Sequence, residues 1–305
     1  GSENPMVVVS LSLLLNDPEP RVRSEVAALF AGLHGKVVLD RLHAMLGESD
    51  PALRGRVVQV LGDIGDAASV ARLDTLLDAG DRDLAFDAIG ALGKIGAWGP
   101  ERKLAGVLAD ESRHYTVRAQ AAWALGRLGR TRTLQGADAF KIDEVLKRAV
   151  LDSDERVGHA ALGALVETNP AGTEEMLAAL VYGRIDGETG EGSAEASGTQ
   201  ATGLRILAAR LLGGLRGPGA EKALLEAGKS ADADLRREAL LALARSGGRQ
   251  AVSVLVAGLD AVEKEVRLAA LDALSLLSEE HAAVGKLSAL LDDPDEVVRC
   301  RFRVQ

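Results

Sequence analysis

The sequence predicts an all-α fold, an α-solenoid of about nine stacked helix pairs, and three observations lead to this prediction. An apolar residue followed by arginine opens a helical stretch with a period of 31 residues or slightly more, at Val22, Leu53, Val117, Leu204, Leu235, Val266 and Val298. Aspartate recurs in the turns before these stretches, and aromatic residues make up only 3% of the 305 residues. A repeat of this length buries its apolar face by stacking on its neighbours. We therefore expect helices that meet through small side chains and form a right-handed superhelical arc.

One repeat shows how the elements are expected to begin and end. Residues 37–46 carry an apolar stripe at helical spacing, and a second helix is expected from about Ala52 to Asp63. Asp50 is placed to cap this helix, and Pro51 suits its first turn because the missing N–H would have no partner there. Glycines are expected to stop the second helices, at Gly65, Gly96, Gly129, Gly217 and Gly247.

The arginines of the repeated pair predict a structural ladder along the stack. Its members are Arg23, Arg54, Arg118, Arg205, Arg236 and Arg267, with Arg299 following them. The expected carboxylate partners include Asp17, Asp50, Asp81, Asp152, Asp234 and Asp292. Because a guanidinium group binds a carboxylate at two points, we expect these arginines to be engaged internally and not to form an anion-binding stripe. Ala85 and Gly158 replace arginine in two repeats, where we expect a looser or locally twisted stack.

Two stretches resemble a known repeat family. They are Asp50-Pro51-Ala52-Leu53-Arg54 with Leu61-Gly62-Asp63-Ile64-Gly65, and the run from Val117 to Gly129. Both resemble HEAT repeats, especially the short, glycine-tolerant repeats of phycobilisome-lyase-like (PBS lyase-like) bacterial proteins. The resemblance extends over residues 6–305 and implies an armadillo-like stack of helix pairs, whereas a fold of this kind implies little about function.

The spacing also predicts the domain organisation. We expect residues 1–5 to be tag or cloning-scar residues and residues 6–305 to form a single HEAT-like solenoid domain. The period lengthens twice, through an insertion between repeats near 129–137 and a flexible acidic loop near 183–203. The loop either contacts a partner or is a tolerated surface loop. Neither end shows a polar capping repeat, so end-to-end contacts, a bound partner or a longer protein are all open, and the oligomeric state is not predicted.

Composition limits the classes of partner. The formal net charge of −9 argues against nucleic-acid binding, because such binding depends on basic residues that neutralise phosphates. The absence of a long apolar stretch or a secretory leader predicts a cytoplasmic protein without membrane insertion. A single cysteine, Cys300, excludes an internal disulfide. The abundance of Ala, Leu, Gly and Arg indicates a bacterial source with a GC-rich genome.

No catalytic residue, metal site or cofactor is predicted. The five histidines include no His-Glu dipeptide, which removes the HEAT-like deoxyhypusine hydroxylases, known for His-Glu metal motifs. Gly228-Lys229-Ser230 imitates the end of a phosphate-binding loop, but Ala223 stands where the first glycine is required. No serine or cysteine has an evident base partner in the sequence.

Function is therefore expected to lie in binding. The second helices of HEAT-like stacks line the concave side, and residues expected there include Phe86, Trp123, His159, Arg210 and Arg237. Aromatic and arginine side chains dominate binding hot spots, so these residues predict contacts with a protein or peptide partner. Phe86 and Trp123 are alternatively gap fillers between repeats. We predict a non-enzymatic scaffold or adaptor; by resemblance, the alternative is a HEAT-like subunit of a bilin lyase, which handles phycobiliprotein chromophores.

Overall fold

The structure is a computed structural model that describes residues 4–33, 35–78, 80–131, 141–168, 170–184, 199–215, 217–246, 251–277, 291 and 293–304. All regular elements in these ranges are helices, which confirms the predicted all-α class. The chain divides into two compact units, Gly1–Thr168 and Asn169–Gln305, called unit 1 and unit 2 below.

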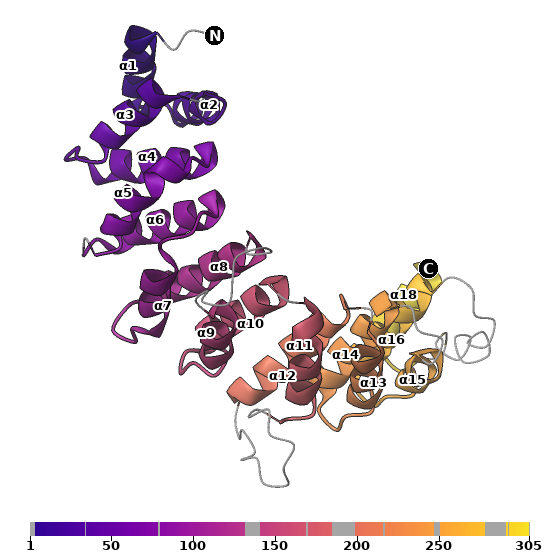
Figure 1. Cartoon of the computed structure of the whole chain (residues 1–305). Coiled ribbons are helices and arrows are strands. Elements are labelled where there is room, and N and C mark those ends of the chain that lie inside the picture. Colours follow the sequence, from indigo (N-terminus) through magenta and orange to yellow (C-terminus); the bar gives the residue numbers. More distant parts are fainter. Residues whose placement is uncertain are drawn as a thin grey trace. The chain divides into compact units, whose positions relative to one another are not determined.

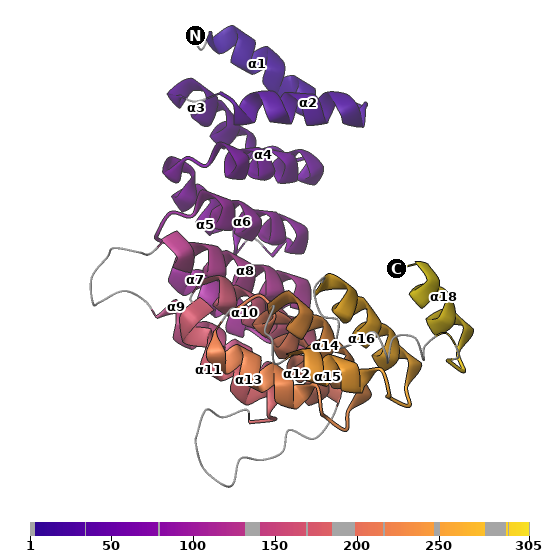
Figure 2. The same cartoon turned by 90° about the vertical axis from the view of Figure 1, so that its right-hand side faces the viewer.

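Unit 1 is a stack of helix pairs arranged in two layers (Figures 1 and 2). The first helices of the pairs are α1 (Pro5–Leu13), α3 (Lys36–Met45), α5 (Val70–Leu76), α7 (Glu101–Ala109) and α9 (Ile142–Ala149). The second helices are α2 (Pro20–Ala31), α4 (Pro51–Ile64), α6 (Arg82–Ile95), α8 (Tyr115–Thr131) and α10 (Glu155–Thr168). Short 3-10 turns, η1 (Leu14–Asn16) and η2 (Ala67–Ser69), join the layers. Each second helix packs against the next one along the chain, as a solenoid requires.

Unit 2 repeats the same arrangement. Its first helices are α11 (Pro170–Val181), α13 (Pro218–Ala227) and α15 (Ala251–Gly258). Its second helices are α12 (Thr199–Leu212), α14 (Ala233–Ser246), α16 (Lys264–Leu276) and α18 (Glu296–Val304), and they pack against one another in that order. Figure 1 shows them in the orange to yellow part of the chain.

The predicted start signals act as expected in the clearest repeats. Asp50 accepts hydrogen bonds from the backbone N–H groups of Ala52 and Leu53, at 2.9 and 3.3 Å, and Pro51 opens α4. Asp81 caps α6 in the same way. Carboxylates at this position satisfy N–H groups that have no partner within the helix.

The predicted stop signals are confirmed at two glycines and wrong at two others. Gly65 and Gly96 end α4 and α6 with φ of 74° and 67°, a left-handed conformation that favours glycine. Gly129 instead lies inside α8, and Gly217 precedes α13 as its N-cap residue. Gly247 lies outside the described residues.

Small residues let successive second helices approach closely. A Cβ atom on Gly62 would stand 2.7 Å from the Cα atom of Ala91, and one on Gly126 would stand 3.0 Å from the Cα atom of Ala164. In unit 2, Gly213 faces Ala242 in the same manner, at 2.9 Å. Glycine therefore determines the separation of the second helices, as the low aromatic content predicts.

The two predicted insertions fall mainly outside the described residues. Residues 132–137 of the first one and residues 185–198 of the second are not described, and helix α12 begins at Thr199, inside the predicted loop. At the chain start, Asn4 caps α1 and Pro5 is its first residue, so these two predicted tag residues contribute to a helix. The single continuous domain over 6–305 stays a prediction. Among the described helices, none combines the length and apolar character that spanning a membrane requires.

Candidate functional site

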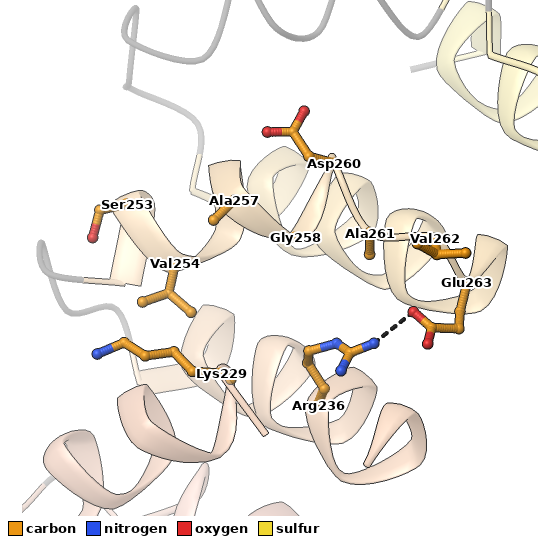
Figure 3. Close-up of a pocket in the computed structure, with 11 residues that line it drawn as sticks. Lys229, Arg236, Ser253, Val254, Ala257, Gly258, Asp260, Ala261, Val262 and Glu263 are labelled. Atoms are coloured by element: carbon orange, nitrogen blue, oxygen red, sulfur yellow. Dashed lines mark hydrogen bonds and ion pairs between the residues drawn. The ribbon is translucent and has the colours of Figure 1, made fainter. Parts of the chain in front are cut away.

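A cavity of about 590 Å³ lies between two successive repeats of unit 2 (Figure 3). Its wall is largely apolar, with contributions from Val254, Ala257, Ala261 and Val262. The charged groups at its edge already have partners: Arg236 pairs with Glu263 at 2.5 Å, and Lys229 pairs with Glu226 at 3.1 Å. Ligand pockets rely on a few polar groups for orientation. Lys229 and Arg236 are thus both paired within the chain. We therefore do not assign this cavity as a ligand-binding site.

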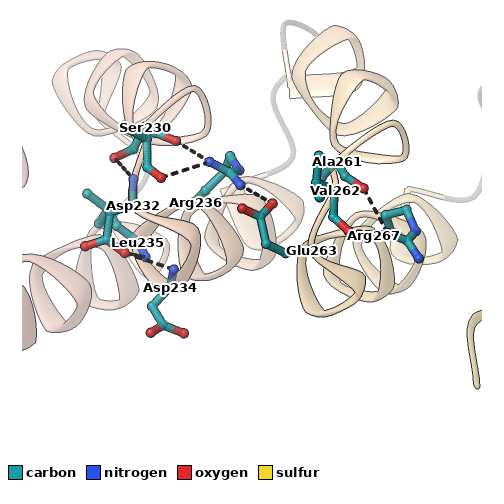
Figure 4. Close-up of polar contacts among 10 residues, drawn as sticks. Ser230, Asp232, Asp234, Leu235, Arg236, Ala261, Val262, Glu263 and Arg267 are labelled. Carbon is teal, nitrogen blue, oxygen red and sulfur yellow. Dashed lines mark hydrogen bonds and ion pairs between the residues drawn. The ribbon is translucent and has the colours of Figure 1, made fainter. Parts of the chain in front are cut away.

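Arg236 and Arg267 each connect the turn of their own repeat to the turn of the next. Figure 4 shows both contacts of Arg236 and the contact of Arg267 with the turn of its own repeat. Arg236 donates from Nη1 to the carbonyl oxygen of Ser230 at 2.5 Å, and its Nη2 atom reaches Glu263. Arg267 donates to the carbonyl oxygens of Ala261 and Val262 at 2.9 and 2.8 Å. It also forms a two-point bond with Asp293, at 2.8 and 2.9 Å.

The other members of the predicted ladder contact turns or helix ends as well. Arg118 binds Asp152 through Nη2 and donates from Nε to the carbonyl oxygen of Leu108 at 2.9 Å. The remaining contacts are those of Arg54 with Asp81 at 3.6 Å, Arg23 with the carbonyl oxygens of Asp17 and Pro18 at 2.7 and 3.0 Å, and Arg205 with the carbonyl oxygen of Val181 at 3.1 Å. These guanidinium groups are thus engaged within the chain.

Several of the expected carboxylate partners differ from those observed. Asp50 caps α4, and Asp234 pairs with Arg237 at 3.2 Å instead of with a ladder arginine. Asp292 lies outside the described residues, and its neighbour Asp293 is the partner of Arg267. Glu263 was not among the predicted partners, although it stands four residues before Arg267, as Asp50 stands before Arg54. An acidic residue four positions before a ladder arginine was the sequence signal that could have identified Glu263.

The two repeats without the arginine are not alike. At Gly158, a Cβ atom would stand 2.6 Å from the carbonyl oxygen of Val150, so α10 lies closer to the end of α9 than a side chain permits. This contact lies within one repeat, so the expected looser or locally twisted stack stays a prediction there. Near Ala85, Arg113 donates to the carbonyl oxygen of Leu77 at 3.0 Å and thereby satisfies the end of α5 from the following turn.

Three of the five predicted partner-binding residues lie on successive second helices of unit 1. Phe86 on α6 is 38% exposed, a high value for a phenylalanine, whereas Trp123 on α8 is half-buried. The Trp123 ring packs over Gly93, whose Cβ position lies 2.6 Å from the ring atom Cζ3. The guanidinium group of Arg127 lies 5.9 Å from the centre of the same ring. Trp123 therefore fills space between repeats and still presents one part of its ring to the surface.

His159 on α10 is half-buried and lies in the same layer. Its Nε2 atom stands 3.4 Å from Glu155 on the preceding turn of the same helix. Arg210 on α12 and Arg237 on α14 belong to unit 2. The five residues thus divide between two second-helix surfaces, one in each unit.

Polar pairs that join neighbouring second helices were missed by the sequence analysis. In unit 1, the Gln59 side-chain amide donates to Asp87 at 3.0 Å, and Lys94 pairs with Asp63 at 2.6 Å. In unit 2, Arg210 donates twice to Glu238, at 3.0 and 3.1 Å. The Gln59–Asp87 and Arg210–Glu238 pairs are each 28 residues apart, three less than the repeat period, and Lys94 and Asp63 are 31 residues apart. A search for polar residues at these spacings would have found them.

The same position in the two units has opposite electrostatics. Burial raises the pKa of Asp87, and the negative charges of Asp83 and Asp81 add to the rise. The hydrogen bond from neutral Gln59 and the charge of Lys94 oppose the rise without cancelling it. Burial also opposes ionisation of Glu238, but the bonds and charges of Arg210 and Arg245 outweigh it and lower the pKa of that carboxyl. Unit 2 therefore holds a firmly ionised carboxylate between arginines.

One serine–histidine contact was also missed. The Nε2 atom of His43 lies 2.9 Å from the hydroxyl oxygen of Ser69, beside a cavity of about 400 Å³ that is also lined by Asp40, Asp66 and Arg72. Ser69 is completely buried and does not line the cavity, so its hydroxyl is closed to a substrate. Burial, with help from Arg72, lowers the pKa of His43 and keeps the ring neutral at pH 7. Within the described ranges, no cluster of His, Cys, Asp and Glu is arranged to hold a metal ion.

Stacked helix pairs of this length, linked by arginines from turn to turn, define an α-solenoid built from short repeats. The family model for HEAT repeats matches residues 8–93, 194–275 and 223–302, and the chain belongs to this family. No curated protein sequence matches the chain.

Solved structures give a fold likeness. The X-ray structure of the Escherichia coli protein YibA is 17% identical, with 92% of this chain and 95% of that chain covered and a TM-score of 0.53, which supports the shared fold alone. Human deoxyhypusine hydroxylase in complex with glycerol is 19% identical over 90% of this chain and 97% of its own, with a TM-score of 0.38. The complex of CpcE and CpcF of phycocyanin lyase from Nostoc is 20% identical over 84% and 94%, with a TM-score of 0.42. The low TM-scores of the last two give them no weight in assigning an activity.

Proposed function

We propose that this protein is a non-enzymatic scaffold or adaptor that binds a partner protein through the exposed surface of its second helices. The observation that carries the proposal is the aromatic surface of unit 1, formed by Phe86, Trp123 and Arg127. Phe86 is exposed, and the guanidinium group of Arg127 lies over the Trp123 ring, 5.9 Å from its centre. Such side chains supply most of the binding energy in protein interfaces.

The engagement of the ladder arginines supports this choice of surface. Arg118, Arg236 and Arg267 bind turns and carboxylates inside the stack, so they are not available to a partner. On the second helices of unit 1, Phe86 is exposed and Trp123 and Arg127 are partly exposed. HEAT repeats usually mediate protein interactions, and an elongated surface suits a peptide or a helix of a partner.

A bilin lyase subunit remains the alternative by resemblance, but no contact or cavity among the described residues favours it. The buried hydroxyl of Ser69 gives no support to a hydrolytic function either. The bacterial and cytoplasmic setting rests on composition alone and forms part of this proposal.

The proposal is tested by affinity capture from a bacterial lysate with the wild-type chain, Phe86→Asp and Trp123→Asp. Tyr182→Asp is the matched control, because Tyr182 is 41% exposed and carries Arg184 near its ring, at 5.7 Å, in unit 2. We expect at least one protein that the wild type and the control retain and both unit 1 variants lose. Identical captured proteins from all four folded chains would contradict the proposal.

A further inference from the structure

Two exposed arginines of unit 2 share one buried carboxylate. Arg210 on α12 bonds to Glu238 on α14 through Nε and Nη2. Arg245, two helical turns further along the same face of α14, reaches the same carboxylate at 3.4 Å. The side chain of Glu238 is only 7% exposed, whereas those of Arg210 and Arg245 are 55% and 46% exposed. The carboxylate thus lies beneath two guanidinium groups that face solvent.

The charges of this cluster do not balance. Glu238 neutralises one of the two arginines, and the neighbouring Arg237 pairs with Asp234 at 3.2 Å. Helix α12 carries no acidic residue at all. The cluster of Arg210, Glu238 and Arg245 therefore carries a net positive charge, although the formal net charge of the chain is −9.

The matching positions on α4 and α6 of unit 1 carry the opposite charge. There, Gln59 takes the place of Arg210, Asp87 that of Glu238, and Lys94 that of Arg245. Lys94 pairs with Asp63, at 2.6 Å, so one cation stands beside two carboxylates. The matching group in unit 1 therefore has a net negative charge. Because helices stack there without the two arginines, the arginines of unit 2 are not required for stacking.

The arginine cluster is preorganised to bind an anionic group. Arg210 uses Nε and Nη2 for Glu238, and a guanidinium group has further N–H donors on Nη1 that suit a second carboxylate. A side chain already fixed by a buried partner loses less conformational freedom on binding. Ile206 and Leu241, half-buried, lie four residues from Arg210 and Arg245 on the same helix faces. Cationic and aliphatic groups thus alternate on this surface.

We propose that the second-helix surface of unit 2, centred on Arg210, Glu238 and Arg245, binds a partner segment rich in Asp or Glu and in aliphatic residues. The inference rests on the proposed function, since it takes the second helices as the binding surface, and it names the chemistry of the partner. Charge complementarity favours carboxylates of a protein. A nucleic acid would need many phosphate contacts from a chain with a net negative charge.

The test is direct binding of a labelled 15-residue peptide of Glu and Leu, followed by fluorescence anisotropy. A second peptide has every Glu replaced by Gln. The protein variant is Arg210→Gln/Glu238→Gln/Arg245→Gln, which removes the cations without leaving Glu238 buried and unpaired. Arg130→Gln is the control, because Arg130 is a 53% exposed arginine of α8 and its loss changes the net charge by the same single unit.

We expect the wild type to bind the Glu peptide about tenfold more tightly than the Gln peptide, a difference that added salt reduces. The triple variant should lose this preference while its circular dichroism melt stays close to wild type, and Arg130→Gln should keep it. Equal binding of the two peptides by the wild type, or an unchanged preference in the triple variant, would overturn the inference. Tighter binding of a 15-residue oligothymidylate than of the Glu peptide would also overturn it, in favour of a nucleic acid.

The two proposals fail separately. Loss of the peptide preference together with intact Trp123-dependent capture would leave the proposed function in place and remove only the acidic partner. Suppose that Trp123→Asp still binds the Glu peptide and captures the same proteins as the wild type. This result would overturn the proposed role of the aromatic surface and support binding at the arginine cluster.

Discussion

Asp152 and Asp87 are both carboxylates between neighbouring helix pairs, yet their surroundings give them opposite effects on stability. Asp152 is 9% exposed and receives the guanidinium group of Arg118, itself 4% exposed. Asp87 is half-buried, bonds to a neutral amide and stands near two further carboxylates. A buried carboxylate is stable when a cation pairs with it. Its ionised form is destabilised when the neighbouring groups are also negative.

Replacing Asp152 should therefore be costly. Asp152→Ala leaves the Arg118 guanidinium buried without its carboxylate, and we expect a loss of about 3–5 kcal/mol in the free energy of unfolding. Urea unfolding followed by circular dichroism measures this loss. Asp83→Ala is the control, since Asp83 is 85% exposed and its pair with Arg82 should contribute nothing measurable. A similar midpoint for both variants would show that the ladder pair is not structural.

Replacing Asp87 should have the opposite effect, and only at higher pH. Its raised pKa means that the folded chain holds the proton more strongly than the unfolded chain does. Stability contributed by the protonated carboxyl is therefore lost as pH rises from its ordinary value of 3.8 through the raised value. Asp87→Asn keeps an acceptor for Gln59 and should raise the melting temperature by no more than a few degrees at pH 7. Below pH 3.8 the two melting curves should coincide, and a gain that persisted there would exclude this electrostatic cause.

At the scale of the element, the separation of the second helices depends on which glycines face a neighbouring backbone. Gly62 of α4 and Gly163 of α10 are both interior glycines of second helices. A Cβ atom on Gly62 would meet Ala91, whereas one on Gly163 would meet no atom within 4 Å. The two positions are equal in helix propensity and differ in packing.

Alanine at these two positions should change stability in opposite directions. Gly62→Ala should destabilise the chain by about 1–3 kcal/mol, because α4 and α6 must move apart. Gly163→Ala should stabilise it by about 0.5–1 kcal/mol, because alanine loses less backbone entropy in a helix than glycine does. Thermal melts of both variants test this pair, and a stabilising Gly62→Ala would show that the helices separate at little cost.

At the scale of the whole molecule, each unit has its own layers and its own buried core. In unit 1 the core includes Leu61, Leu92, Leu125 and Leu162, all fully buried on second helices. Because each repeat of a solenoid contacts only its neighbours, its stability is approximately a sum over repeats and their interfaces. A core of this extent is expected to persist without distant repeats.

Residues 1–168 alone should therefore fold. We expect a far-ultraviolet circular dichroism spectrum with helical minima and a cooperative thermal melt, although at a lower temperature than for the full chain. A spectrum typical of random coil would show that unit 1 depends on unit 2 for folding.

The sequence by itself determined the all-α class, the repeat period and much of the helix capping, because these depend on residues close together in the chain. Asp50, Pro51, Gly65 and Gly96 act through their own backbone neighbours, so local pattern was enough to place them. The apolar–arginine pair likewise marked most second helices, the exceptions being α6 with Ala85 and α10 with Gly158. Gly129 was misjudged, since only the surrounding helix shows that it packs on Thr168 in place of ending α8.

Only the tertiary structure decided which side chains meet across repeats. The contacts of Gln59 with Asp87, of Arg210 with Glu238 and of His43 with Ser69 join residues 26 to 28 positions apart, on different helices. The sequence predicted Arg210 as a partner-binding residue but could not show that Glu238 lies buried beneath it. Burial and pairing, which govern the charge of a carboxylate, arise only when two helices pack, and so the arginine cluster of unit 2 became visible only in the folded chain.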